Sequence, residues 1–167
     1  MTGSMLFSDG AAAVIVTGNN ESKGLNIDHF YSTVAVKAKK DMAWELSSKG
    51  FLMTLSGYIP ELIEEDFNNL VSNAVTAAGL DKEDITHWCI HPGGKKILEA
   101  VHKSLGFTNG QLENCYEVLK EYGNMSSPTV LFVLEKIMQQ LEERAQGKIF
   151  GAAFGPGITM ETFILSV

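Results

Sequence analysis

Two polar side chains of this sequence stand where a neutral hydrogen-bond donor could act on a substrate. His91 follows an apolar stretch and is itself followed by Pro92-Gly93-Gly94. Asn124 shortly precedes an amphipathic stretch that begins at Pro128. An imidazole or a carboxamide can donate a hydrogen bond to an oxygen that gains negative charge during a reaction. If the fold brings His91 and Asn124 together, the pair could stabilise an oxyanion such as a thioester enolate.

Each of the two residues also has an ordinary structural explanation. His91 could be a core histidine hydrogen-bonded to the backbone, and Asn124 could occupy a left-handed turn or cap the following helix. The place of His91 at the carboxyl end of a predicted strand favours a ligand site, because α/β sheets bind ligands at that edge. The glycines that follow His91 would also let the backbone approach a ligand closely.

Other chemistries have weaker support. Cys89 and Cys115 lie in segments that predict a buried strand and a helix, so we interpret both as buried small hydrophobes. A hydrolase nucleophile at Ser126 or Ser127 is disfavoured because no Gly-x-Ser-x-Gly motif is present. The glycine-rich stretch 151–157 lacks the spacing of a phosphate loop and predicts a tight turn. No spacing of His, Cys and carboxylate residues predicts a metal site.

The elements that must position these residues alternate between strands and helices. The apolar run 11–16 predicts a strand buried on both faces. Further strands are predicted at 25–36, 51–55, 84–90, 148–154 and 158–167. Apolar residues at spacings of three and four predict helices at 60–79, 94–105, 113–122 and 128–140. This order predicts an α/β fold, a mixed sheet with helices packed on it, in a single domain covering 1–167.

Composition excludes several classes of partner. The chain has 167 residues, 45% of them hydrophobic, and a net charge of −7, which argues against binding nucleic acid or an anionic membrane. The one basic cluster, Lys37, Lys39 and Lys40, has no interleaved aromatic residues and predicts a solvated turn. No apolar run approaches the roughly 18 residues that span a bilayer, and no secretory leader is evident. We therefore expect a cytoplasmic protein with free thiols.

Four segments taken together resemble the chalcone and stilbene synthase family, the type III polyketide synthases of the thiolase-like superfamily. They occur in the family's order, and the similarity extends over essentially the whole chain. The segments are Leu6-Phe7-Ser8-Asp9-Gly10-Ala11-Ala12-Ala13-Val14-Ile15-Val16, His91-Pro92-Gly93-Gly94, Tyr122-Gly123-Asn124-Met125-Ser126-Ser127 and Phe154-Gly155-Pro156-Gly157-Ile158-Thr159-Met160-Glu161-Thr162. The resemblance implies the C-terminal half of a thiolase-like fold, without the N-terminal half that carries the family's nucleophilic cysteine.

The resemblance also implies an activity and its residues. The full-length protein would be an acyltransferase that condenses malonyl-coenzyme A onto an acyl-coenzyme A starter with loss of carbon dioxide. His91 and Asn124 would be the catalytic oxyanion donors. Phe7 resembles one gatekeeper phenylalanine, and Met53 falls at the position of the other. The remaining expected substrate or coenzyme A contacts are Gly93, Gly94, Ser126, Phe154, Gly155 and Pro156.

The resemblance implies no cofactor besides coenzyme A thioester substrates, and a homodimer of the full-length protein. Met53, Trp44 and Ala153 depart from the family's usual residues, so a chalcone product does not follow. Two alternatives stay open: a ketoacyl-carrier-protein synthase of the third type, and a non-catalytic fragment that binds coenzyme A and associates with a partner chain. The isolated chain is expected to be unable to form an acyl-enzyme.

Overall fold

The centre of the molecule is a four-stranded mixed sheet. A computed structural model describes residues 6–18, 24–34, 41–108, 110–141 and 147–167. The strand order across the sheet is β1-β6-β5-β4, with β1 at Asn26–Val34, β4 at Ile85–Ile90, β5 at Lys148–Gly155 and β6 at Thr159–Ser166. Strands β4 and β5 are parallel, whereas β6 is antiparallel to both β5 and β1. The mixed α/β architecture is confirmed; the lysine cluster at 37–40 lies outside the described residues.

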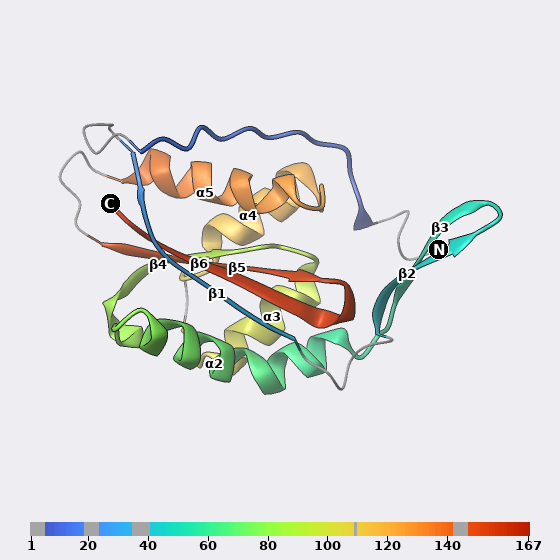
Figure 1. The fold of residues 1–167 in the computed structure, drawn as a ribbon, viewed down its shortest axis with the longest axis horizontal. Helices are drawn as coiled ribbons and strands as arrows, with labels where there is room; N and C mark the ends of the chain where they lie inside the picture. Colours follow the sequence, from blue (N-terminus) through green and yellow to red (C-terminus); the bar gives the residue numbers. More distant parts are fainter. Residues whose placement is uncertain (1–5, 19–23, 35–40, 109, 142–146) are drawn as a thin grey trace.

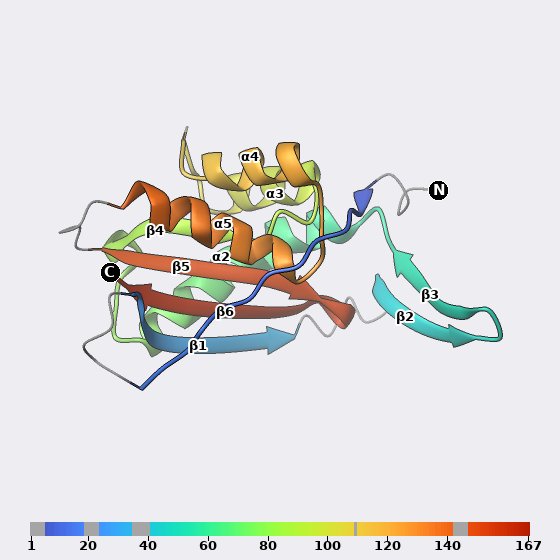
Figure 2. The same ribbon diagram turned by 90° about the horizontal axis from the view of Figure 1, so that it is seen from above.

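Helices cover both faces of this sheet (Figure 1). Their bounds are Ile59–Ala77 for α2, Lys95–Ser104 for α3, Glu113–Tyr122 for α4 and Pro128–Gln140 for α5. Helix α5 lies on one face and α2 on the other, with α3 packed beside α2 and α4 beside α5 (Figures 1 and 2). Because α3, α4 and α5 all intervene between β4 and β5, the chain can return to make these two strands parallel.

The core fills the space between the sheet and these helices. In α2 the predicted apolar stripe is buried, including Ile63, Phe67 and Leu70. Between edge strand β4 and its neighbour β5, the rings of Trp88 and Phe150 are 5.3 Å apart. Burying a side chain of this size stabilises a fold by about 2 to 3 kcal/mol. The strand end that carries His91 is therefore attached to the packed core.

The predicted helix bounds agree closely with those observed. Helices α4 and α5 match their predictions, and α2 begins one residue before Pro60. Gly79 follows the end of α2 with φ of +71°, the left-handed conformation that ends many helices. Asp84 belongs to the short 3-10 helix η2, Lys82–Asp84, so β4 starts one residue later than predicted. No helix among the described residues is long and apolar enough to cross a membrane.

The prediction of a buried strand at 11–16 is wrong for this structure. The segment is extended but forms no strand, and Val14, Ile15 and Val16 are 61%, 97% and 72% exposed. It starts beside the N-terminal end of α5 and runs away from that helix toward the side of β1 (Figures 1 and 2). The physical reason is that an apolar strand needs a hydrogen-bonded neighbour, and no described strand pairs with it.

The other apolar strand prediction, at 51–55, is confirmed as β3. Strands β2, Met42–Ser47, and β3, Gly50–Leu55, form an antiparallel hairpin that projects from one end of the molecule (Figures 1 and 2). Met53 pairs with Trp44 across this hairpin, and the ring of Trp44 meets that of Phe51 edge-on. Both Trp44 and Phe51 are more than half exposed. The base of the hairpin contacts the short 3-10 helix η3, Pro156–Ile158, between β5 and β6.

Candidate active site

His91 is held at the carboxyl end of β4 by continued pairing with β5. Its backbone N–H donates to the carbonyl oxygen of Ala152 at 2.8 Å, so the parallel ladder extends to the histidine itself. The backbone then turns tightly, with the N–H of Gly93 donating to the carbonyl of His91 at 2.9 Å. Helix α3 starts two residues later. The strand thus fixes the position of the histidine, and the turn brings the loop back beside its ring.

The imidazole of His91 is a neutral group at physiological pH. The side chain is 9% exposed, and burial lowers its pKa from 6.5 to about 4, since the charged form loses its hydration. Within the described part of the chain, no hydrogen bond to the ring is found, so the alternative of a core histidine bonded to the backbone has no support. A neutral imidazole carries one N–H donor. His91 therefore has a donor available for a ligand.

Asn124 is placed by the turn between α4 and α5. Its side chain is 4% exposed, and both ends of the carboxamide are engaged. Oδ1 accepts a hydrogen bond from the backbone N–H of Ser126 at 2.8 Å, and Nδ2 donates to the carbonyl oxygen of Gly93 at 3.0 Å. Asn124 itself is neither the left-handed residue of this turn, which is Ser126, nor the N-cap of α5, which is Ser127, so both structural explanations considered for it are wrong in detail. Its Oδ1 instead closes a short turn by bonding to the backbone two residues on. Nδ2 carries two N–H groups, which leaves one for a ligand.

Gly93 connects the two predicted donors. It accepts the hydrogen bond from Asn124, and a Cβ atom built on it would lie 3.6 Å from Nε2 of His91. The imidazole and the carboxamide, 33 residues apart in sequence, therefore meet the same glycine.

A third, distant segment completes this corner. Phe7 forms an isolated parallel bridge with Asn124, in which the N–H of Asn124 donates to Leu6 at 3.3 Å and the N–H of Ser8 donates to Asn124 at 2.8 Å. The hydroxyl of Ser8 also donates to the carbonyl of Tyr122. A Cβ atom on Gly94 would be 3.4 Å from Leu6. We call Phe7, His91, Gly93, Gly94 and Asn124 the donor corner.

The remaining predicted site residues lie at varying distance from the donor corner. Phe154 and Gly155 are the last residues of β5 and Pro156 follows them, at the carboxyl ends of the parallel strands where His91 also lies, although the Phe154 ring packs against Phe67 of α2. Ser126 is exposed but reaches the corner through its N–H. Met53, 37% exposed on the projecting hairpin, is not among the residues that the described contacts bring together.

The two cysteines are buried, as predicted. Neither thiol has any exposed surface. Burial, and secondarily the neighbouring Cys115, raises the pKa of Cys89, and burial raises the pKa of Cys115 to about 12. Thiolate is the nucleophilic form of cysteine, so neither residue is set up for acyl transfer. The described residues also contain no cluster of three or more His, Cys, Asp or Glu side chains suited to a metal ion.

One residue of this region carries no sequence signal that would single it out. Thr129 is fully buried in the first turn of α5, where its hydroxyl accepts from the backbone N–H of Met125 and donates to the carbonyl of Ser126. A threonine just after a helix-starting proline is common, so only the structure reveals these contacts.

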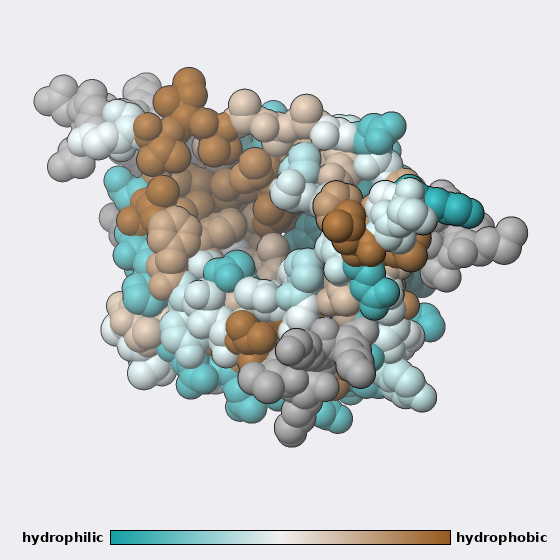
Figure 3. All heavy atoms as spheres, turned by 45° about the vertical axis from the view of Figure 1, so that its right-hand side comes forward, coloured by the Kyte–Doolittle hydropathy of each residue, from teal (hydrophilic) through white to brown (hydrophobic). Residues whose placement is uncertain are grey.

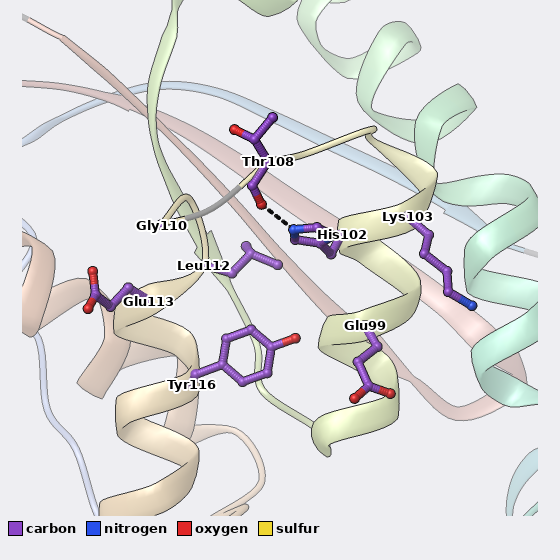
Figure 4. A pocket seen from close by; sticks show the side chains of 8 residues that line it. All are labelled: Glu99, His102, Lys103, Thr108, Gly110, Leu112, Glu113 and Tyr116. Carbon is purple, nitrogen blue, oxygen red and sulfur yellow. Dashed lines mark hydrogen bonds between the residues drawn. The ribbon is translucent and has the colours of Figure 1, made fainter.

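A cavity of about 700 Å³ lies away from the donor corner, between α3 and α4 (Figure 4). None of the predicted site residues lines it. The ring of His102 donates to the carbonyl of Thr108, and Lys103 points away from the cavity and pairs with Glu64 of α2 at 3.3 Å. The lining residues are Glu99, His102, Lys103, Thr108, Gly110, Leu112, Glu113 and Tyr116.

The sequence of the chain matches a known family over most of its length. Residues 27–167 match the family described as chalcone and stilbene synthases, C-terminal domain. The chain belongs to this family. A curated relative from Bacillus subtilis strain 168, provisionally named a chalcone synthase, is 30% identical over 99% of this chain and 47% of its own length.

Solved structures of type III polyketide synthases share the fold. The 1,3,6,8-tetrahydroxynaphthalene synthase of Streptomyces coelicolor A3(2) superposes with a TM-score of 0.88 at 26% identity, over 96% of this chain and 46% of that one. The polyketide synthase PKS-I of the brown alga Ectocarpus siliculosus gives 0.77 at 27% identity, over 88% and 41%. The chain is the C-terminal domain of a type III polyketide synthase, with the thiolase-like fold, and spans slightly less than half the length of these relatives.

Proposed function

We propose that the full-length protein is an acyltransferase that extends an acyl-coenzyme A starter by decarboxylative condensation with malonyl-coenzyme A. The observation that carries this proposal is the donor corner, where the carboxamide of Asn124 and the imidazole of His91 both meet Gly93. Membership of a polyketide synthase family supports the same reaction class. No cofactor beyond the coenzyme A thioesters is required by this chemistry.

In this proposal the two donors act on the malonyl thioester. When carbon dioxide leaves, the electron pair of the broken carbon–carbon bond enters the thioester, and its oxygen becomes an enolate oxygen. His91 and Asn124 each donate one N–H to that oxygen. Because both groups are buried and the carboxamide of Asn124 is held by backbone contacts, little reorganisation is needed as charge develops. The depressed pKa of His91 keeps it a neutral donor rather than an acid.

The acyl-loading step, which precedes carbon–carbon bond formation, needs a nucleophile from outside this chain. A cysteine thiolate in the N-terminal half would attack the starter thioester and release coenzyme A as a thiolate. The enolate carbon would then attack the acyl-cysteine carbonyl, and the cysteine thiolate would leave. The burial of Cys89 and Cys115 supports placing the nucleophile elsewhere. Phe7, Gly94, Ser126, Phe154, Gly155 and Pro156 are proposed to contact the substrate or coenzyme A, and Met53 to do so once the hairpin is covered.

The N-terminal half is also the proposed partner for the exposed apolar surface. Figure 3 shows apolar side chains gathered over the extended segment and over neighbouring strands of the sheet. The exposed apolar residues of these parts are Val14, Ile15, Val16, Ile27, Phe30 and Val34. Large contiguous apolar surfaces on a folded chain mark interaction sites. The full-length protein is proposed to be a homodimer.

The test is malonyl-coenzyme A decarboxylation by the full-length protein. Removing one oxyanion donor typically lowers the rate about 100-fold to 1,000-fold, so His91→Ala and Asn124→Ala are each expected to lose activity on that scale. His87→Ala is the matched control, because His87 lies on β4 outside the donor corner and its ring is hydrogen-bonded to the hydroxyl of its neighbour Thr86. Unchanged decarboxylation in both test variants would refute the donor assignment.

Two further outcomes separate the alternatives. Binding of malonyl-coenzyme A without any turnover by the unaltered protein would support a non-catalytic binding module. A starter thioester that labels the isolated chain covalently would contradict our placement of the nucleophile in the other half.

A further inference from the structure

The turn that holds Asn124 contains an unfavourable backbone conformation. Ser126 has φ of +66°, a left-handed value that residues with a side chain seldom adopt. Within the same turn, the N–H of Ser126 donates to Oδ1 of Asn124 at 2.8 Å. That bond fixes which end of the carboxamide is the acceptor, so Nδ2 is the end that faces the carbonyl of Gly93.

The hydroxyl of Thr129 stabilises this turn from both sides. Oγ1 accepts a hydrogen bond from the N–H of Met125 at 2.9 Å and donates one to the carbonyl of Ser126 at 2.7 Å. It therefore binds the peptide group between Asn124 and Met125 and the one between Ser126 and Ser127. Thr129 is 0% exposed and Met125 is 6% exposed, so water does not readily replace either bond.

We propose that Thr129 is a positioning residue for the donor Asn124, acting through the backbone of Met125 and Ser126. It touches no substrate in this role. Its hydroxyl holds the backbone of Met125 and Ser126 in this turn, and the N–H of Ser126 in turn keeps Nδ2 of Asn124 directed to the carbonyl of Gly93. The expected effect on rate rests on the proposed function of Asn124, whereas the effect on the carboxamide itself does not.

The experiment compares Thr129→Val with Thr162→Val in the full-length protein. Valine has the shape of threonine but no hydroxyl. Thr162, on inner strand β6, is a matched control because it is also buried, at 4% exposure. Its hydroxyl donates at 2.8 Å to the carbonyl of Tyr31 on β1, the edge strand opposite β4. Both variants lose a buried hydroxyl, and only Thr129→Val should disturb Asn124.

The first measurement is the side-chain amide signal of Asn124 in asparagine-labelled protein, assigned from its absence in Asn124→Asp. Thr129→Val is expected to shift or broaden this signal, while Thr162→Val leaves it in place. Thr129→Ser, which restores the hydroxyl, should return the signal to its original position. An Asn124 signal that is the same in Thr129→Val and Thr162→Val would overturn the inference.

The second measurement is the rate of malonyl-coenzyme A decarboxylation. Because a misplacement of about 1 Å can cost a catalytic group about 100-fold, kcat should fall by at least about 10-fold in Thr129→Val with little change in KM. Thr129→Ser should recover most of this loss. If Thr129→Val does not fold, Thr129→Cys, with a weakly bonding thiol, should give an intermediate loss and an intermediate signal shift.

The two measurements distinguish the possible failures. A displaced Asn124 signal with unchanged decarboxylation would refute the proposed function of Asn124 and leave its positioning by Thr129 in place. A loss of rate in Thr129→Val with no change in the Asn124 signal would refute the positioning role.

Discussion

At the scale of single residues, burial decides what His91 and Asn124 can do. The same imidazole in water would be partly charged near neutral pH, whereas the low exposure of His91 holds it neutral. Asn124 is defined by its two partners, which settle the direction of its carboxamide. Residue type alone names both as donors. Their protonation state and orientation come from what surrounds them.

The lowered pKa of His91 predicts a specific pH dependence of stability. Between pH 6.5 and about 4, the unfolded chain binds a proton at this histidine that the folded chain does not. Stability should therefore fall as the pH decreases through this window, by on the order of 3 kcal/mol in total. The measurement is the free energy of unfolding at several pH values, compared with that of His91→Gln, which lacks the titrating group. A ring signal of His91 that titrates near pH 6.5 by NMR would contradict the prediction.

At the scale of elements, strand β5 supports the candidate site, because it pairs with β4 up to His91 and ends with the predicted site residues Phe154 and Gly155. Its glycine at position 151 makes room for an aromatic ring on the next strand. A Cβ atom at Gly151 would lie 2.0 Å from the ring of Phe163, closer than any real contact. The glycine is thus required by packing in the middle of a strand, where glycine is otherwise unfavourable.

Gly151→Ala is therefore expected to destabilise the protein by about 1 to 3 kcal/mol, the usual cost of forcing an extra carbon into a packed core. Urea unfolding of the full-length protein measures the change. Gly155→Ala, on the same strand, is the control, since its Cβ would meet only ordinary contacts at 3.8 Å or more. Equal stability of the two variants would show that Phe163 moves aside without cost.

Elements with a strong local pattern were predictable from the sequence. The stripe of α5 and its starting proline give its bounds, and the glycine after α2 marks the end of that helix. The structure of segment 11–16 was not predictable in this way, although its apolar pattern is equally clear. A strand depends on a neighbour that may come from any part of a protein, whereas a helix satisfies its own backbone. The run Ala11-Ala12-Ala13-Val14-Ile15-Val16 has no such neighbour among the described residues.

At the scale of the whole molecule, the chain exposes surface that a folded protein would normally bury. Ile15 is 97% exposed, Phe30 on β1 is 66% exposed, and the hairpin exposes Leu46 and Phe51. The relatives are more than twice as long as this chain. The simplest physical account is that the remaining part of the protein covers this surface.

Ile15→Asp is accordingly expected to weaken association between this chain and a separately expressed N-terminal half at least about 10-fold. The reason is that a carboxylate would replace an apolar side chain that the N-terminal half is expected to bury. Co-purification of the two halves at graded concentrations measures the effect. Glu65→Lys, an exposed charge change on α2, should leave association unchanged. Equal association of both variants would show that the 11–16 segment stays exposed in the complete protein.

The sequence by itself determined the helices, the strands of the main sheet and the family, and it singled out His91 and Asn124 as candidate donors, because these follow from local periodicity and from short motifs. Only the tertiary structure decided that Phe7, His91 and Asn124 share one corner, that Gly93 joins the two candidate donors, and that Thr129 supports the turn. Contacts between residues tens of positions apart depend on how the elements pack, and no local pattern encodes them. For the same reason, the strand expected at 11–16 needs a neighbour that the described residues do not supply.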